Sequence, residues 1–225
     1  MINFFNYLAK RIFDLSLSTL GLFILSPIFI VVGLGVIKDG GPVFFLQERV
    51  GRYGHLFRII KFRTMTPDAE KIGGKITRKG DTRITRVGLI LRQFKIDELP
   101  QLLNVFLGHM SLVGPRPEVP EYVQEWTDID RKIILAIKPG ITDYASLLYS
   151  NEAEILALAD NVEQVYINEV MPYKLRLYRK YAKEMNLWLD IRIVIATLAK
   201  IAGLSLQPIL PELIETKSNK VVHNA

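Results

Sequence analysis

One long uncharged stretch dominates the distribution of hydrophobic and polar positions along the chain. Residues 15–37 read LSLSTLGLFILSPIFIVVGLGVI, 23 consecutive positions without a charged side chain. About 20 apolar residues are enough to cross the hydrocarbon core of a bilayer as a helix. A cleaved signal peptide has a shorter apolar region and a small-residue cleavage site, which does not follow here. A soluble helix without a polar face would need protein on every side, so the pattern predicts insertion into a membrane.

The middle and the flanks of this stretch indicate how it inserts. Ser26-Pro27 lies almost at its centre, where proline removes a helix hydrogen bond. Lys10 and Arg11 precede the stretch and Lys38 follows it, so the positive-inside rule draws both ends towards the cytoplasm. A spanning helix with a simple kink is the alternative, because spanning helices tolerate proline, but it satisfies only one flank. We therefore expect residues 1–37 to form a re-entrant helix hairpin, broken at Ser26-Pro27, that enters and leaves through one leaflet.

The rest of the pattern predicts a helix-rich α+β domain. Two β-prone runs between Pro42 and Met65 flank Gly51-Arg52-Tyr53-Gly54 and are typical of a β-hairpin. Amphipathic periodicity, punctuated by proline and glycine, follows further along the chain. The expected helices lie at residues 100–107, 118–137, 151–185 and 188–204, and a basic loop is expected at residues 71–88. We expect a membrane-associated catalytic domain at residues 38–205 and a loosely ordered tail at residues 206–225.

Composition narrows the possible chemistry. The chain contains no cysteine, which excludes disulfides, Cys-ligated zinc or iron–sulfur sites, and a thiol nucleophile. Only three of its 225 residues are histidine, so a multi-histidine metal site is disfavoured. The mean hydropathy of +0.20 is high for a chain with 23% charged residues, because apolar residues are concentrated in the membrane stretch. Carboxylates are thus the leading candidates for a nucleophile.

The positive charge is concentrated directly after the membrane stretch. The net charge is +6, but residues 38–95 alone hold 14 Lys and Arg against 5 Asp and Glu, a local charge of +9. Such a block beside a membrane attracts anionic headgroups or an anionic substrate. Nucleic-acid binding is the competing interpretation. No zinc-finger or RNA-recognition signature supports it, and a membrane anchor argues against it.

Asp97-Glu98-Leu99-Pro100 is the strongest candidate for catalysis. Adjacent carboxylates repel each other, and at a helix start they can simply benefit from the positive end of the helix dipole. The functional alternative is a carboxylate nucleophile at Asp97 beside a carboxylate, Glu98, that holds a divalent metal. Carboxylates form covalent acyl-phosphate intermediates, and Mg²⁺ combines one or two carboxylates with substrate phosphates. Arg92 and Lys95, just upstream, would help to neutralise phosphate charge.

Basic residues elsewhere give weaker signals. Lys61 and Arg63 lie two apart on the second expected strand, so they would share one face and could bind a diphosphate. A solvated strand face is the simpler explanation of that pair. Arg116 stands between Pro115 and Pro117, which fix its backbone. This arrangement is either a rigid loop or a guanidinium held ready for a phosphate or a nucleobase.

Two further interpretations belong to other classes of protein. Asp128-Ile-Asp130 matches the D-x-D motif of many nucleotide-sugar glycosyltransferases. It lies within an amphipathic helical pattern rather than after a buried strand, so we interpret it as a solvated helix face. The other class is a non-catalytic membrane-surface scaffold, which would bind anionic lipid through residues 38–95.

Several long motifs resemble one family. The run DTRITRVGLILRQFKIDELPQLLNVFLGHMSLVGPRPE at Asp81–Glu118 closely resembles the bacterial sugar transferases that act on polyprenyl phosphate, the small monotopic phosphoglycosyl transferases. GPVFFLQERVG and FRIIKFRTM upstream, KPGITDYASLLYS at Lys138–Ser150 and the Tyr178–Leu198 region are similar to the same family, in the family's order. The likeness covers most of Lys10–Leu204. Residues 93–96 and His109 differ from the commonest residues there without removing a proposed catalytic group.

The resemblance implies a reaction and roles for residues. It implies transfer of a sugar 1-phosphate from a UDP-sugar donor to a polyprenyl phosphate acceptor, with release of UMP, at the cytoplasmic face of a bacterial inner membrane. Asp97 would be the nucleophile that forms a phosphosugar–aspartyl intermediate, and Glu98 the carboxylate associated with Mg²⁺. The resemblance further assigns Pro115, Arg116 and Pro117 to the uridine side, Lys61, Arg63 and Arg92 to phosphate contacts, and Ser26-Pro27 to the break of a re-entrant membrane helix.

Overall fold

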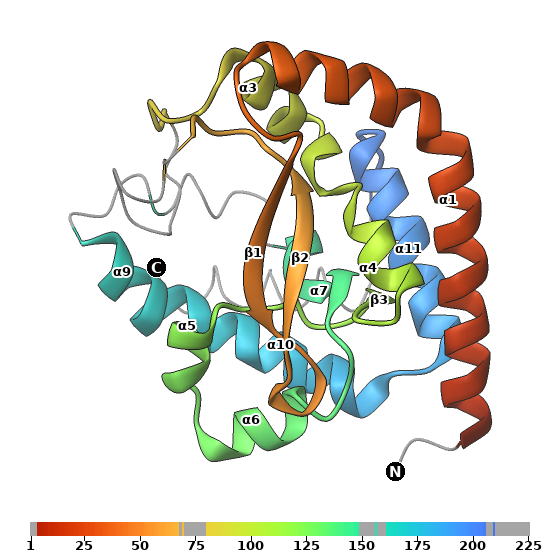
Figure 1. The fold of residues 1–225 in the computed structure, drawn as a ribbon. Coiled ribbons are helices and arrows are strands. Elements are labelled where there is room, and N and C mark those ends of the chain that lie inside the picture. Colours follow the sequence, from red (N-terminus) through yellow and green to blue (C-terminus); the bar gives the residue numbers. More distant parts are fainter. Residues whose placement is uncertain are drawn as a thin grey trace.

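The computed structural model describes residues 4–67, 80–148 and 161–205, together with residues 69, 156 and 209. In Figure 1 a long bent helix follows one side and the top of the molecule, a β-hairpin runs through the middle, and shorter helices surround it. The elements are α1 (Phe4–Lys38), β1 (Phe44–Val50), η1 (Arg52–Gly54), β2 (Leu56–Phe62), α3 (Arg86–Gln93), η2 (Ile96–Glu98), α4 (Gln101–Phe106), β3 (Ser111–Val113), α5 (Pro120–Gln124), α6 (Asp128–Ile134), β4 (Gly140–Thr142), α7 (Tyr144–Leu148), α9 (Val162–Val165), η3 (Tyr166–Val170), α10 (Met171–Glu184) and α11 (Leu187–Ile201). The predicted α+β, helix-rich class is confirmed.

Two small sheets organise the chain around its core. β1 and β2 pair antiparallel, with Phe44 opposite Phe62, and the predicted hairpin is confirmed. β3 and β4 form a second, parallel pair, a contact between distant segments that the sequence did not indicate. A Cβ placed on Gly140 would lie only 2.1 Å from the backbone nitrogen of Gly114, so only glycine permits this crossing. The crossing sets the position of the Pro115 loop that follows β3.

Helix α1 is bent at proline rather than interrupted. It is one helix of 35 residues with Pro27 inside it, and Figure 1 shows it rising along one side and then turning across the top. The missing N–H of Pro27 leaves the carbonyl of Phe23, four residues earlier, without its usual helix partner. The hydroxyl of Ser26 donates to that carbonyl at 2.8 Å. The expected break at Ser26-Pro27 is therefore a bend, because the serine replaces the lost hydrogen bond and the helix continues.

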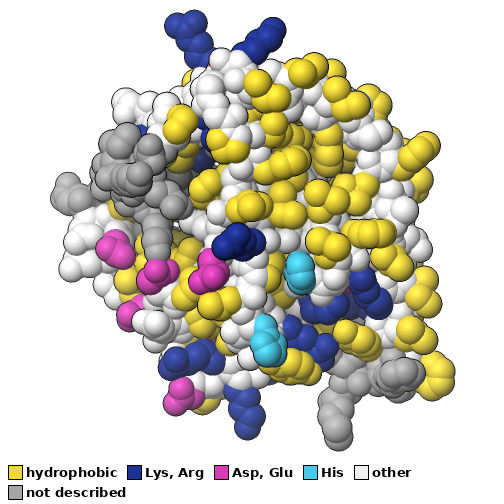
Figure 2. Space-filling model, viewed as in Figure 1, with side chains coloured by type: hydrophobic (Ala, Val, Ile, Leu, Met, Phe, Trp, Pro, Cys, Tyr) yellow, Lys and Arg dark blue, Asp and Glu magenta, His cyan; other side chains and the backbone are white. Residues whose placement is uncertain are grey.

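Most of α1 is uncovered by the rest of the chain. Phe23, Ile30 and Val31 are 79%, 66% and 69% exposed, and only 11% of the apolar part of the helix is buried. Figure 2 shows hydrophobic side chains gathered over the upper right of the molecule, where Figure 1 places α1 and α4. Among the described residues, α1 is the one helix long and apolar enough to cross a membrane. A core helix would be mostly buried, so that alternative does not fit α1.

The second half of the chain is built from shorter helices than the periodicity predicts. The expected helix at residues 118–137 is two helices, α5 and α6, because the Thr127 side chain accepts the amide of Asp130 and starts a new helix. α10 carries Pro172 in its first turn, where proline is tolerated, so that residue does not interrupt it. α11 confirms the predicted apolar helix near residues 188–204. Half of the expected basic loop at 71–88, the start of the helix at 151–185 and nearly all of the tail lie outside the described residues. The last three residues of that expected loop are helical, because α3 begins at Arg86.

The D-x-D residues at the start of α6 face different surroundings. The Asp128 side chain is 98% exposed and pairs with Arg131 at 3.1 Å. Asp130 is buried and pairs with Arg179 of α10 at 2.8 Å. A solvated face describes Asp128 only, whereas Asp130 joins two helices. The two carboxylates are thus committed to separate ion pairs.

A buried polar cluster fixes the N-terminal part of α1 on the domain. Lys10 Nζ lies 2.5 Å from the carboxylate of Asp190 on α11 and 3.0 Å from the carbonyl oxygen of Val113 on β3. The hydroxyl of Tyr181 on α10 donates to the same carboxylate at 2.6 Å. The Asp190 side chain is fully buried. A buried carboxylate is tolerated only when cations and donors surround it, so this cluster fixes where α1 attaches.

Removing the cation of this cluster should destabilise the fold strongly. Lys10→Met leaves the Asp190 carboxylate buried without a counter-charge, and we expect the free energy of unfolding in detergent micelles to fall by roughly 3–5 kcal/mol. Denaturant unfolding followed by circular dichroism measures this loss. The control is Arg131→Met, which removes the exposed pair with Asp128 and should cost less than about 1 kcal/mol. Equal losses in the two variants would contradict the role of the cluster.

Candidate functional site

The acidic pair lies on a tight turn between α3 and α4. Asp97 and Glu98 belong to the 3₁₀ turn η2, which follows Lys95 in a left-handed backbone conformation with φ of 57°. Pro100 is the N-cap of α4, which begins at Gln101 and confirms the helix predicted near residues 100–107. The left-handed residue reverses the chain, so η2 packs beside β2 and brings the acidic pair near the hairpin.

Two cations from distant segments hold Glu98. Lys61 Nζ on β2 lies 3.1 Å from Oε1 of Glu98. The guanidinium of Arg116 binds both carboxylate oxygens, with Nη1 3.1 Å from Oε2 and Nη2 on Oε1. Burial alone would raise the pKa of Glu98, but Arg116 and Lys61 hold that pKa well below its usual range. Glu98 is therefore an ionised carboxylate at neutral pH.

Asp97 is held differently from its neighbour. Its side chain is almost fully buried, and Oδ1 has no hydrogen-bond partner. Burial and the negative charge of Glu98 raise the pKa of Asp97, while Lys61, Arg92 and Lys95 act against that rise. A carboxylate oxygen that is desolvated and unpartnered is more reactive than a solvated one, because no hydrogen bond must be given up before it attacks.

The Pro-Arg-Pro loop projects Arg116 over the acidic turn. The carbonyl oxygen of Pro115 accepts the amide of Gly140 at 2.9 Å, so the loop is tied to β4. The carboxylate of Glu98 raises the pKa of Arg116 well above its already high usual value. The structure thus brings together Glu98, Arg116 and Lys61, three of the predicted site residues.

Arg92 is near the acidic turn, whereas Arg63 is turned into the fold. Arg92 Nε donates to the Thr64 hydroxyl at 2.8 Å, and its charge acts on Asp97. α3 approaches closely here, since a Cβ on Gly88 would lie 2.1 Å from the carbonyl oxygen of Thr64. β2 ends at Phe62, so Arg63 lies beyond the strand. The prediction that Lys61 and Arg63 share one strand face is therefore wrong.

The buried guanidinium of Arg63 serves the backbone. Its nitrogens donate to the carbonyl oxygens of Pro42, Met65 and Val36 at 2.9, 3.2 and 2.9 Å. Val36 lies in the last turns of α1, so Arg63 joins the end of that helix to the hairpin. A phosphate contact for Arg63 stays a prediction.

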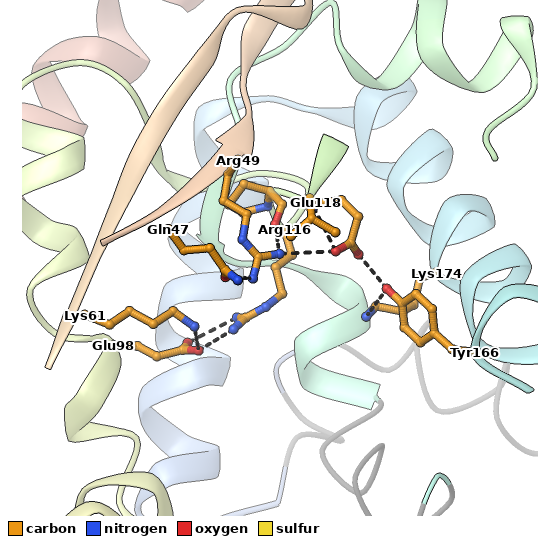
Figure 3. Close-up of polar contacts among 10 residues, drawn as sticks. Gln47, Arg49, Lys61, Glu98, Arg116, Glu118, Tyr166 and Lys174 are labelled. Atoms are coloured by element: carbon orange, nitrogen blue, oxygen red, sulfur yellow. Dashed lines mark hydrogen bonds and ion pairs between the residues drawn. The ribbon is translucent and has the colours of Figure 1, made fainter. Parts of the chain in front are cut away.

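A second carboxylate network, which the sequence did not indicate, adjoins the first. Figure 3 shows Glu118 on the far side of Arg116 from Glu98, between Arg49 and Tyr166. Arg49 Nη1 lies 3.2 Å from Oε1 of Glu118, and the Tyr166 hydroxyl donates to Oε2 at 2.5 Å. Lys174 Nζ reaches that hydroxyl at 3.5 Å. Of the residues in this network, only Glu118 lies next to a predicted site motif, because it directly follows Pro117.

A cleft of about 830 Å³ connects the two networks. Roughly 300–1,000 Å³ is typical of a site for a small-molecule ligand. Glu98 and Arg116 are among the residues that line it. The polar part is lined by Arg49, Glu118, Tyr122, Tyr166 and Lys174, and the apolar part by Phe94, Leu99, Leu102, Leu198 and Ile201. Phe94, Leu198 and Ile201 are more than half exposed, so the apolar part opens on the surface.

This arrangement suits the transfer of a phosphate-bearing group. One carboxylate, Asp97, has an unpartnered oxygen, and the other, Glu98, is permanently ionised between cations. Lys61, Arg92 and Arg116 supply the positive charge that stabilises phosphoryl oxygens. Glu98 and Arg116 line the cleft together with both polar and apolar side chains, whereas Asp97, Lys61 and Arg92 are not among its lining residues.

Comparisons with known proteins agree with the geometry. The chain is 34% identical to the UDP-N-acetylgalactosamine-undecaprenyl-phosphate N-acetylgalactosaminephosphotransferase of Aeromonas hydrophila, over 85% of this chain and 43% of that protein. It is 34% identical to the UDP-glucose:undecaprenyl-phosphate glucose-1-phosphate transferase of Escherichia coli (strain K12), over 87% of this chain and 40% of that protein. It is also 38% identical to the exopolysaccharide production protein ExoY of Sinorhizobium fredii, over 60% of this chain and 66% of that protein.

A family model covers most of the chain. The chain spans less than half the length of the first two relatives. The family model of the bacterial sugar transferases matches residues 5–203, which include α1, the acidic turn and α11. The chain belongs to the bacterial sugar transferase family.

Proposed function

We propose that this chain transfers a sugar 1-phosphate from a UDP-sugar to polyprenyl phosphate through a covalent aspartyl intermediate. The observation that carries the proposal is the buried, unpartnered Oδ1 of Asp97 beside the ion-paired Glu98. Related proteins have names that specify undecaprenyl phosphate as acceptor and UDP-sugars as donors. Those names support the substrate classes proposed for this chain.

The reaction takes two displacements at phosphorus. An oxygen of Asp97 attacks the sugar-bearing phosphorus of the donor, the bond from that phosphorus to the bridging oxygen breaks, and UMP leaves with that oxygen. A phosphate oxygen of the polyprenyl phosphate then attacks the same phosphorus and releases the Asp97 carboxylate. The product is a polyprenyl diphosphate sugar. Two steps allow two anionic substrates to use one site in turn, which avoids simultaneous crowding of their charges.

Mg²⁺ fits this site only together with substrate. Among the described residues there is no group of three acidic or histidine side chains that could hold a metal. Mg²⁺, however, commonly takes one or two carboxylates and completes its shell with phosphate oxygens and water. Glu98 offers such a carboxylate. When bound, the ion would neutralise diphosphate charge, and Glu98 would hold it while Lys61 and Arg116 orient that carboxylate.

The uncovered apolar surfaces match an acceptor that is buried in a membrane. The exposed length of α1, bent at Pro27, would enter and leave one leaflet, because both its flanks are basic. The apolar part of the cleft opens beside Leu198 and Ile201 and would receive the lipid chain. The polar part, with Arg49 and Glu118, would receive the soluble nucleotide. We therefore propose that the domain lies at the cytoplasmic face of a bacterial inner membrane.

Asp97→Asn should abolish turnover. The amide oxygen is a far weaker nucleophile, so we expect UMP release to fall at least about 10³-fold across a panel of UDP-sugars with polyprenyl phosphate present. The matched control is Asp128→Asn, which alters an exposed carboxylate and should leave the rate unchanged. Normal UMP release by Asp97→Asn would remove the covalent mechanism. UDP release that depends on Asp128 would identify a D-x-D glycosyltransferase, and no release of either nucleotide would favour a scaffold.

The fall of activity at low pH should follow the protonation of the Asp97 carboxylate. The attacking carboxylate must be ionised, and burial and Glu98 raise its pKa, so kcat/KM should fall with decreasing pH at values above the ordinary Asp pKa of about 3.9. Lys95→Gln removes a positive charge that lowers the pKa of Asp97, so its acid limb should lie at higher pH than the wild-type limb. A limb that is unmoved or moves to lower pH contradicts this assignment. Circular dichroism over the same range excludes unfolding.

Glu98 should control the response to Mg²⁺. Chelation with EDTA should stop UMP release from the wild type, and added Mg²⁺ should restore it. Glu98→Gln removes the proposed metal carboxylate, so we expect the Mg²⁺ concentration for half-maximal rate to rise at least about 10-fold. The matched control, Glu118→Gln, alters a carboxylate of the same cleft that pairs with Arg49 and should keep the wild-type Mg²⁺ dependence whatever its rate. The same dependence in both variants argues against the role of Glu98.

A further inference from the structure

Three cations from separate elements converge beside the N-terminal part of α1. Arg11 lies on α1, Arg52 on the hairpin turn η1, and Lys138 between α6 and β4. A Cβ placed on Gly108 would lie 3.3 Å from Nη2 of Arg11 and 3.6 Å from Nζ of Lys138. Both positive groups therefore approach one point above the Gly108 backbone. Arg52 and Lys138 also line, with Tyr7, a small cavity beside that point.

These three cations have no carboxylate partner among the described parts of the chain. Arg11 donates instead to the carbonyl oxygens of Val105 and Phe106 at the end of α4, at 2.7 and 2.9 Å. Arg52 donates to the carbonyl oxygen of Ala136 at 2.9 Å.

The acidic and basic neighbours of the cluster are already occupied. Asp14 borders the same cavity, but its Oδ1 accepts the amide of Leu112, and it is almost fully buried. Lys10 is neutralised by Asp190. Burial and then the charge of Arg11 lower the pKa of Lys138. Asp14 supplies one opposing charge, which acts to raise the pKa of Lys138. Three cations therefore face one carboxylate, and the excess of positive charge suits an external anion.

The surroundings of the cluster are those of a membrane–water interface. Ile12, Phe106 and Leu107 are 58%, 43% and 59% exposed. The Arg52 guanidinium lies over two aromatic rings, 5.1 Å from the ring of Tyr7 and 4.5 Å from that of Tyr53. Figure 2 shows Lys and Arg side chains beside hydrophobic ones at the lower right, where Figure 1 places the N-terminal part of α1. Apolar side chains bordered by aromatic and basic ones are typical of the headgroup level.

We propose that Arg11, Arg52 and Lys138 bind the phosphate group of an anionic membrane phospholipid, at a site separate from the catalytic cleft. Guanidinium and ammonium groups from three directions match the several acceptor oxygens of a phosphate. None of the three lines the cleft that holds Glu98 and Arg116. The inference rests on the proposed membrane association, but not on the transferase chemistry. The bound lipid would hold the hairpin turn and the loop before β4 against the N-terminal part of α1.

Thermal unfolding of the full chain in a non-ionic detergent tests the proposal. Dioctanoylphosphatidylglycerol should raise the melting temperature in a saturable way, and dioctanoylphosphatidylcholine should do so less, because its choline offsets the phosphate charge. Lys138→Gln should raise the half-saturating concentration of dioctanoylphosphatidylglycerol about fivefold. Lys132→Gln, which removes an exposed cation of α6, should leave it unchanged. The comparison uses the lipid dependence of each variant, so a lower starting stability does not affect it.

Further measurements distinguish a lipid phosphate from free phosphate, and the lipid site from the proposed transferase activity. Equal stabilisation by sodium phosphate at the same concentration would assign the cluster to free phosphate and overturn the lipid site. An absent lipid effect, or one that Lys138→Gln leaves intact, would also overturn it. Asp97→Asn should show the wild-type lipid effect, so the result does not depend on whether the chain is a transferase.

Discussion

The whole site depends on keeping an acidic turn charged while it is buried. Two adjacent carboxylates at Asp97 and Glu98 would repel each other and become protonated if the fold offered no positive charge. Lys61 from the hairpin and Arg116 from the Pro-Arg-Pro loop meet on Glu98 and keep it ionised. Both cations and their carboxylate are thereby fixed to one another, so three segments far apart in sequence are positioned together. Asp97 is left buried with an unpartnered oxygen, Oδ1, on the carboxylate that we propose attacks phosphorus.

The hairpin and α1 surround this centre for connected physical reasons. Lys61 and Arg49 lie on the strands of the hairpin, on the side of the cleft. Arg52 lies on the hairpin turn, beside the N-terminal part of α1. α1 is attached at one end through Lys10 and the buried Asp190. At its other end Val36 packs with Phe62 and accepts a hydrogen bond from Arg63. A helix fixed at both ends and bent in the middle leaves its apolar length uncovered, which suits the proposed transfer from a soluble donor to a membrane-bound acceptor.

The sequence predicted the parts that depend on local signals. The hairpin follows from β-prone runs around a glycine-rich turn, α11 from its apolar periodicity, and the acidic pair from its position before Pro100. Other features depended on small local differences that periodicity does not resolve. β2 ends one residue before Arg63, so Arg63 does not share the strand face of Lys61. The hydroxyl of Ser26 replaces a lost hydrogen bond, so α1 is continuous. The Thr127 cap starts a new helix within the expected helix at residues 118–137. The pairs Arg49–Glu118 and Lys10–Asp190 join segments 69 and 180 residues apart. No spacing along the chain indicates such contacts.

The central claim is that Asp97 carries the phosphosugar between donor and acceptor. Intact-protein mass spectrometry after incubation with UDP-sugars, in the absence of polyprenyl phosphate, tests it most directly. The wild-type chain should gain the mass of one sugar phosphate, added polyprenyl phosphate should remove it, and Asp97→Asn should gain nothing. An adduct that persists in Asp97→Asn would rule out Asp97 as the carrier of the phosphosugar. So would the absence of any adduct with a donor from which the wild type releases UMP.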